Sequence, residues 1–103
     1  MKNFTVSPRA KADLNEIWTY LAEHTEHSVA DRVLKQIRET IRMVGRQPGI
    51  GSRVGDRSPG LRFVLAGKYV VFYENQTHLP RIRRVMHGAR DLSEYFGTED
   101  EAL

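Results

Sequence analysis

The stretch "LRFVLAGKYVVFYE", residues 61–74, has the pattern of a β-hairpin. Residues 61–66 alternate in hydrophobicity, and residues 69–74 are rich in the aromatic and β-branched side chains that strands favour. Gly67 and Lys68 separate the two runs, and so short a link with a glycine is typical of a tight hairpin turn. The sequence therefore predicts two antiparallel strands in this stretch.

The segment downstream of this hairpin, "RIRRVMHGARD" at residues 81–91, holds four arginines and a histidine. The first part of the segment alternates, which predicts a third strand. Strict alternation places one set of side chains on the face away from the core, namely Arg81, Arg83, Val85 and His87. It places the other set toward the core, namely Ile82, Arg84 and Met86.

Two further expectations follow from these two faces. Arg84 would need a carboxylate, because an unpaired charge on the core side is costly, and Asp91 is one candidate. Arg62 is out of phase with Leu61 and Phe63 on its own strand, so we expect it to join the arginines on the face away from the core.

Two amphipathic helices are predicted upstream of the hairpin. The first spans residues 7–24 and begins at Ser7, which is a good N-cap. The second can be capped by Ser28 and is ended by Gly45 and Pro48. The link between the helices is so short that it allows only an antiparallel helical hairpin.

Together these elements predict an α+β fold. A short strand near the N-terminus precedes the helical hairpin, and a three-stranded antiparallel meander follows it, so that the helices pack on one face of a twisted sheet. Residues 46–60 contain four glycines and two prolines and are predicted to be a loop. We assign residues 1–96 to a single domain and residues 97–103 to an acidic, flexible tail.

The charge of the chain is unevenly distributed. All 16 Lys and Arg lie in residues 1–90, which hold eight Asp and Glu, whereas residues 91–103 hold five acids and no base. Arginine pairs with phosphate and with carboxylate, so a nucleic acid and an acidic protein both fit as partners. Solubility alone is a third explanation.

Several classes of protein are excluded or disfavoured. The chain has no cysteine, which rules out disulfides and thiolate metal sites. No run approaches the roughly 20 apolar residues of a membrane span, and no signal peptide is recognisable, so we expect a cytoplasmic protein. His24 and His27 have no third ligand in view, and no metal or other cofactor is expected.

A metal-independent ribonuclease is one chemical possibility. It would need a base, an acid and arginines around the phosphate. His87, Tyr73 and Arg62 could fill these roles, but their spacing does not require it.

Three motifs resemble the ParE branch of the RelE/ParE toxin superfamily. They are A-x-x-D-L-x-x-I-W-x-Y at residues 10–20, G-x-Y-V-V-F-Y at residues 67–73 and R-V-M-H-G-A-R-D at residues 84–91. The resemblance covers nearly the whole chain, in order. It implies a small basic toxin without a catalytic cycle, a ParD-like antitoxin in a hetero-oligomeric complex, and DNA gyrase as the target.

The RelE branch of the superfamily, which cuts mRNA on the ribosome, is the alternative. Members of that branch carry an arginine in the middle strand, where this chain has Val70, and a Lys-Arg-type pair after the last strand, where this chain reads "HGARD". Arg90 is near but shifted, and Tyr95 could stand for their terminal tyrosine. Because a valine cannot stabilise a phosphate in its transition state, the ParE branch is favoured. A relative that only binds its antitoxin is a third possibility.

The ParE interpretation assigns roles to the residues of the last strand. We expect the antitoxin or gyrase to contact five residues, namely Arg62, Arg81, Arg83, His87 and Arg90. We expect Arg84 and Asp91 to form a structural ion pair.

Overall fold

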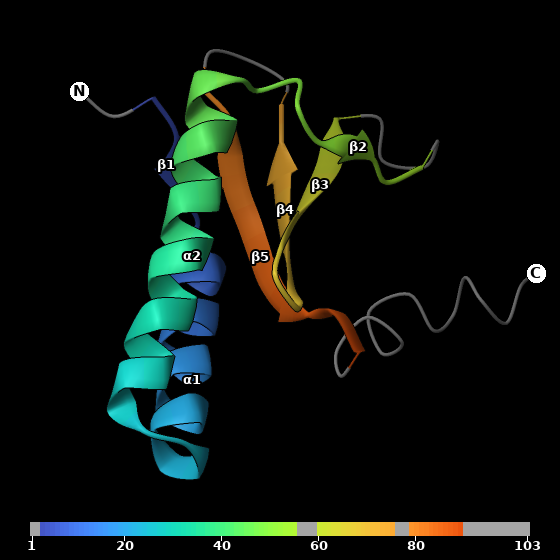
Figure 1. Cartoon of the computed structure of the whole chain (residues 1–103). Helices are drawn as coiled ribbons and strands as arrows, with labels where there is room; N and C mark the ends of the chain where they lie inside the picture. The colour runs from blue at the N-terminus through green and yellow to red at the C-terminus, as the bar shows by residue number, and fades with distance from the viewer. Residues whose placement is uncertain (1–2, 56–59, 76–78, 90–103) are drawn as a thin grey trace, which may run out of the picture.

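The computed structural model describes residues 3–55, 60–75 and 79–89 and has two layers (Figure 1). One layer is a helical hairpin of α1 (Pro8–His24) and α2 (His27–Arg46). The other is a five-stranded sheet of order β1-β5-β4-β3-β2. Its strands are β1 (Thr5–Val6), β2 (Ser52–Arg53), β3 (Leu61–Ala66), β4 (Tyr69–Glu74) and β5 (Arg81–His87).

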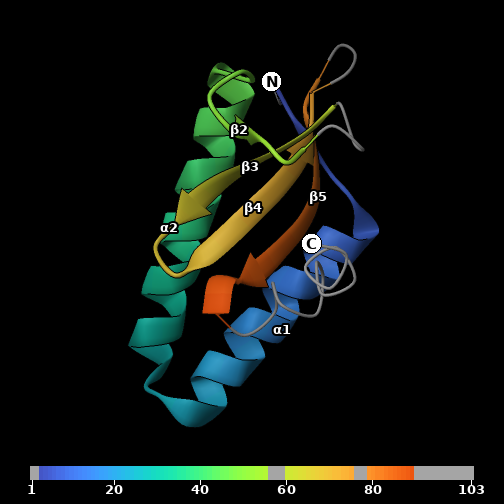
Figure 2. The same cartoon turned by 90° about the vertical axis from the view of Figure 1, so that its right-hand side faces the viewer.

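Strand β1 runs parallel to β5, and the other neighbouring strands are antiparallel. Both helices cover the same face of the sheet, as the perpendicular view makes clear (Figure 2). The predicted α+β class is confirmed. Within the described residues, neither helix combines the length and apolar character that crossing a membrane requires.

The predicted N-cap of the first helix is confirmed, and the predicted N-cap of the second is wrong. Ser7 caps α1 as predicted, and its side-chain oxygen accepts a hydrogen bond from the Ala10 amide at 3.0 Å. The prediction that Ser28 caps α2 is wrong, because the helix begins at His27 and its N-cap is Glu26. The Glu26 carbonyl accepts from the Val29 and Ala30 amides, so Ser28 already lies in the first turn.

Strand β2 lies inside the segment that was predicted to be only a loop. It pairs with β3 through Ser52 and Arg53, opposite Phe63 and Arg62. Two residues are too few to display an alternating pattern, so no sequence pattern indicated this strand.

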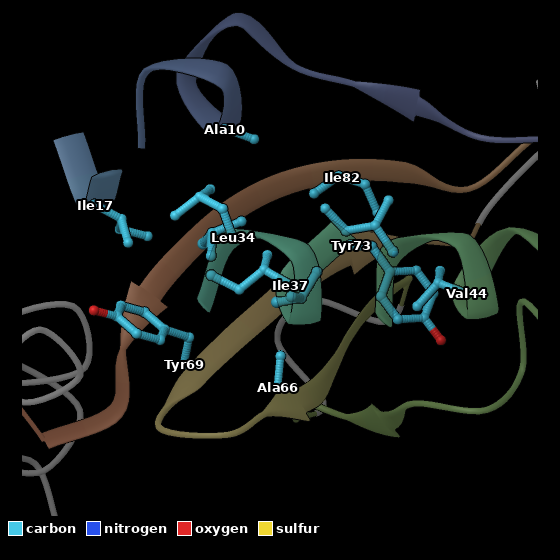
Figure 3. Close-up of a cluster of buried hydrophobic side chains, with 12 residues drawn as sticks. Ala10, Ile17, Leu34, Ile37, Val44, Ala66, Tyr69, Tyr73 and Ile82 are labelled. Carbon is cyan, nitrogen blue, oxygen red and sulfur yellow. The ribbon is translucent and has the colours of Figure 1, made fainter. Parts of the chain in front are cut away.

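The main core lies between the helices and the sheet (Figure 3). Its buried side chains are Ala10 and Ile17 of α1, Leu34, Ile37, Ile41 and Val44 of α2, and Ala66, Tyr69, Val71, Tyr73, Ile82 and Val85 of the sheet. A second apolar cluster, centred on Val70, Phe72 and Met86, lies on the opposite face. Strand β4 is therefore buried on both faces, which explains its nearly continuous apolar sequence.

An irregularity in β5 changes which side chains face the helices. In the pairing with β4, Phe72 lies opposite Arg84 and Tyr73 lies opposite Ile82, so Arg83 is an extra residue. The bulge shifts the alternation by one residue. Val85 consequently joins Ile82 in the main core.

The prediction of strict alternation along β5 is therefore wrong beyond Arg83. Met86 lies in the second cluster, away from the helices. His87 lies opposite Tyr69 on the helix-facing side, and the two rings meet edge to face with centroids 5.2 Å apart.

Helix α1 takes the place of a neighbouring strand along much of β5. Strand β1 pairs only with Arg81 and Ile82. Beyond it, the Ser7 side chain donates to the Arg83 carbonyl at 3.0 Å, and the Asp13 carboxylate accepts from the Val85 amide at 2.9 Å. The side chains of Asp13 in α1 and of its N-cap Ser7 thus satisfy backbone groups at the edge of β5.

The same carboxylate holds Arg84. Asp13 Oδ2 accepts from Arg84 Nε at 2.9 Å, and Oδ1 accepts from Nη2 at 3.3 Å. The Asp13 side chain is only 5% exposed, so this is a buried carboxylate with a guanidinium and an amide as donors. The carboxylate that Arg84 requires thus comes from α1. The other proposed partner, Asp91, lies outside the described residues.

We predict that Asp13→Ala lowers the free energy of unfolding by about 3–5 kcal/mol, because it removes the buried carboxylate to which the Arg84 guanidinium and the Val85 amide donate. Glu16→Ala, an exposed change on the same helix, should alter stability by less than about 0.5 kcal/mol. Urea denaturation followed by circular dichroism measures both. Equal stability of the two variants would contradict this role for Asp13.

Candidate functional site

The face of the sheet away from the helices is the candidate site. We call it the outer face and define it by seven apolar residues: Val54, Leu61, Phe63, Leu65, Val70, Phe72 and Met86. Leu65, opposite Val70 in the register, is 64% exposed, the highest value among the exposed large apolar side chains of the described residues. The rest of this face is buried or half-buried.

The centre of the outer face is apolar. Val70 is 4% exposed and packs with Phe72 and Met86. The Phe63 and Phe72 rings lie 6.4 Å apart. This buried apolar centre supplies no cation to a phosphate at the middle strand.

Charged side chains lie at one end of the outer face. Arg81 is opposite Glu74 in the register, and Arg83 Nη1 lies 3.0 Å from Glu74 Oε1. Both arginines are exposed. They lie four residues along β4 from Val70, which is a distance of about 13 Å in a strand.

Arg62 lies on the other side of the sheet from these two arginines. It is opposite Tyr73, whose side chain belongs to the main core, and its Nη1 donates to the Gly51 carbonyl at 2.7 Å. The prediction that Arg62 joins the outward arginines is therefore wrong. Both faces of β3 carry apolar residues, and Leu61 and Phe63 face the second cluster rather than the helices.

Tyr73 anchors the segment that precedes β2. Its hydroxyl donates to the Pro48 carbonyl at 2.6 Å and accepts from the Gly51 amide at 2.9 Å. A side chain at position 51 would be in steric conflict, because its Cβ would lie 2.7 Å from both the Phe63 carbonyl oxygen and the Tyr73 hydroxyl. The anchored segment leads through β2 to Val54, which packs on the outer face.

The three residues that a ribonuclease could use are not brought together. Tyr73 and Arg62 hold the segment around Gly51. His87 is opposite Tyr69, four residues along β4 from Tyr73, or about 13 Å. In the described part of the chain, no three side chains of the His, Cys, Asp or Glu type lie close enough together to hold a metal ion.

The five predicted contact residues do not form one surface. Arg81 and Arg83 lie by Glu74 on the outer side, and Arg62 and His87 lie on the helix-facing side. Arg90 falls outside the described residues, as does Tyr95. Sequence reasoning missed Leu65 as an exposed residue, because the apolar alternation of β3 assigned it to the core.

Comparison with known proteins identifies relatives along most of the chain. A family model described as the ParE toxin of the type II toxin–antitoxin system parDE matches residues 4–92. Toxin ParE1 of Caulobacter vibrioides is 33% identical over 97 residues, which cover 94% of this chain and all of that protein. Toxin ParE1 of Mycobacterium tuberculosis is 30% identical over 70 residues, covering 68% of this chain and 71% of that toxin.

A solved structure shares the fold. A chain from the chromosomal ParDE TA system of P. aeruginosa superimposes with a TM-score of 0.72, covering 84% of this chain and 96% of that chain. Its sequence identity is 17%, so the similarity concerns the fold alone.

We predict that Gly51→Ala lowers stability by about 1–3 kcal/mol, because the added methyl group overpacks the contact with Phe63 and Tyr73. Gly49→Ala is the matched control, since a Cβ there meets no atom within 4 Å. It should cause no loss, and thermal melting measures both variants. If Gly49→Ala were destabilised and Gly51→Ala were not, position 51 would not be packed closely against Phe63 and Tyr73.

Proposed function

Because the chain belongs to the ParE toxin family of type II toxin–antitoxin systems, we propose that it arrests growth by binding DNA gyrase and that an acidic ParD-like antitoxin neutralises it. It is a toxin of the ParE type whose partner is an antitoxin of the ParD kind. The observation that carries the choice of target is the apolar outer face around Val70.

The surroundings of Val70 favour binding over RNA cleavage. Cleavage of a phosphodiester needs positive groups fixed around the phosphate as charge develops. At the middle strand the outer face offers Val70, Phe72 and Met86, all at most 4% exposed. Tyr73 and Arg62, which could have served a ribonuclease, hold backbone groups of Pro48 and Gly51 instead. A toxin without cations at this position acts by binding its target and not by cleaving RNA.

We assign antitoxin binding to the outer face. Leu65 provides an exposed apolar anchor at one end, and Arg81 and Arg83 provide positive charge at the other. An acidic antitoxin segment that folds on binding would cover Leu65 with apolar side chains and pair its carboxylates with Arg81 and Arg83. Arg90 stays a proposed contact of gyrase or of the antitoxin, and Asp91 a proposed structural acid.

We predict that Leu65→Ser weakens antitoxin binding about 10- to 100-fold, since an exposed leucine that becomes buried contributes about 1.5–3 kcal/mol. Ile50→Ser is the matched control, because Ile50 is also exposed but lies before β2 and outside the outer face. Calorimetric titration with the antitoxin gives both affinities. A larger loss for Ile50→Ser would move the antitoxin to another surface.

A gyrase assay tests the proposed target. The purified chain should inhibit supercoiling and accumulate cleaved DNA, and added antitoxin should restore supercoiling. Arg90→Ala should weaken the inhibition while leaving the melting temperature nearly unchanged. Primer extension on a translated message should give no new codon-specific ends. Codon-specific cuts that disappear in His87→Ala or Arg62→Ala would replace this proposal with the RelE-type endonuclease.

A further inference from the structure

Helix α2 carries a row of positive side chains on the side away from the core. We call this row the basic stripe, and its members are Arg32, Lys35, Arg38, Arg42 and Arg46. All five are exposed. At 100° per residue they fall within an arc of about 120°, and their backbone positions span about 21 Å along the helix.

The basic stripe keeps a net positive charge, although both acids of α2 fall within the same arc of the helix. Among the described residues, none of its five members has an Asp or Glu oxygen within the 4.0 Å of an ion pair. The two acids of α2 are Asp31 and Glu39. Asp31 accepts a hydrogen bond from the Trp18 indole of α1 at 2.9 Å, which leaves Glu39 as the remaining acid of α2.

Helix α1 shows that solubility alone does not require such a row. Its exposed charges are Arg9, Lys11, Glu16 and Glu23, which is an even mixture of signs. A mixed surface is sufficient to keep a small domain soluble. The arc of α2 that holds the stripe carries five cations and two acids, Asp31 and Glu39, and such a net positive surface on one helix attracts a polyanion.

We propose that the basic stripe binds the sugar-phosphate backbone of double-stranded DNA. A duplex carries one phosphate per about 1.7 Å of its axis with both strands counted, so a length of about 21 Å holds about twelve phosphates, and the stripe can contact those on the side that faces it. Four of the five side chains are arginines, whose planar fork suits phosphate oxygens. The contact would be independent of base sequence, since only backbone groups are read.

The stripe suits DNA better than an acidic protein because it has no apolar anchor. Specific protein interfaces depend on buried aromatic or aliphatic residues at their centre. The exposed large apolar residues of the described chain are Tyr20, Ile50, Leu65 and Leu79, and none belongs to α2. The helices also cover the sheet face opposite to the outer face, so antitoxin on the outer face would leave the stripe accessible (Figure 1).

Fluorescence anisotropy with a labelled, mixed-sequence duplex and the full chain tests this proposal. If all five cations contact phosphates, a plot of the logarithm of the binding constant against the logarithm of the salt concentration should have a slope of about −4.5 between about 50 and 200 mM. Arg38→Gln combined with Arg42→Gln should make the slope shallower by about 2 and reduce affinity about 10-fold or more at the low-salt end.

The matched control removes the same charge elsewhere, by Lys11→Gln in α1 combined with Lys68→Gln in the β3–β4 turn. It should keep the slope of the unmodified chain. Circular dichroism checks that each variant is folded, and Lys35→Gln with Arg46→Gln replaces the first pair if that pair unfolds.

Three outcomes would overturn the proposal. The chain does not bind the duplex even at low salt, or both pairs of substitutions reduce the slope equally, which would indicate general charge attraction. In the third outcome, removing the stripe charges weakens antitoxin binding and leaves DNA binding unchanged, which would make the stripe a protein contact. None of these measurements involves gyrase, so their result is independent of the proposed target.

Discussion

The attachment of helix α1 to strand β5 depends on the hydrogen bonds that the buried Asp13 carboxylate accepts. Strand β1 covers only the first residues of β5, and beyond it the edge of the sheet would be left unsatisfied. Asp13 accepts the Val85 amide and the Arg84 guanidinium there, while Ser7 binds the Arg83 carbonyl. The helix is thereby held against a strand that lies more than 70 residues later in the chain.

Next to this contact, the bulge at Arg83 lets β5 contribute buried apolar side chains to both faces of the sheet. Ile82 and Val85 complete the main core under the helices, and Met86 completes the cluster on the outer face. The outer face gains an apolar centre around Val70 in this way. This buried apolar centre links the fold to the proposed function, because it offers no cation to a phosphate undergoing cleavage.

Local patterns predicted much of the fold, and long-range contacts explain what they missed. The Ser7 cap and the β3–β4 hairpin depend on residues close in sequence, which a pattern can capture. Arg62 and Met86 were predicted on the wrong faces of the sheet, because simple alternation assumes one buried face and a strand without a bulge. Asp13 was missed because a helical carboxylate does not indicate a distant strand. The residues that contact the antitoxin or gyrase could not be predicted, because the contacts also depend on the structures of those partners.

The central functional claim is that the chain arrests growth through gyrase and not through the ribosome. Pulse labelling of DNA and of protein after induction in cells tests it most directly. Thymidine incorporation should fall first while methionine incorporation continues, and co-expressed antitoxin should restore thymidine incorporation. An immediate loss of methionine incorporation with continued DNA synthesis would contradict it.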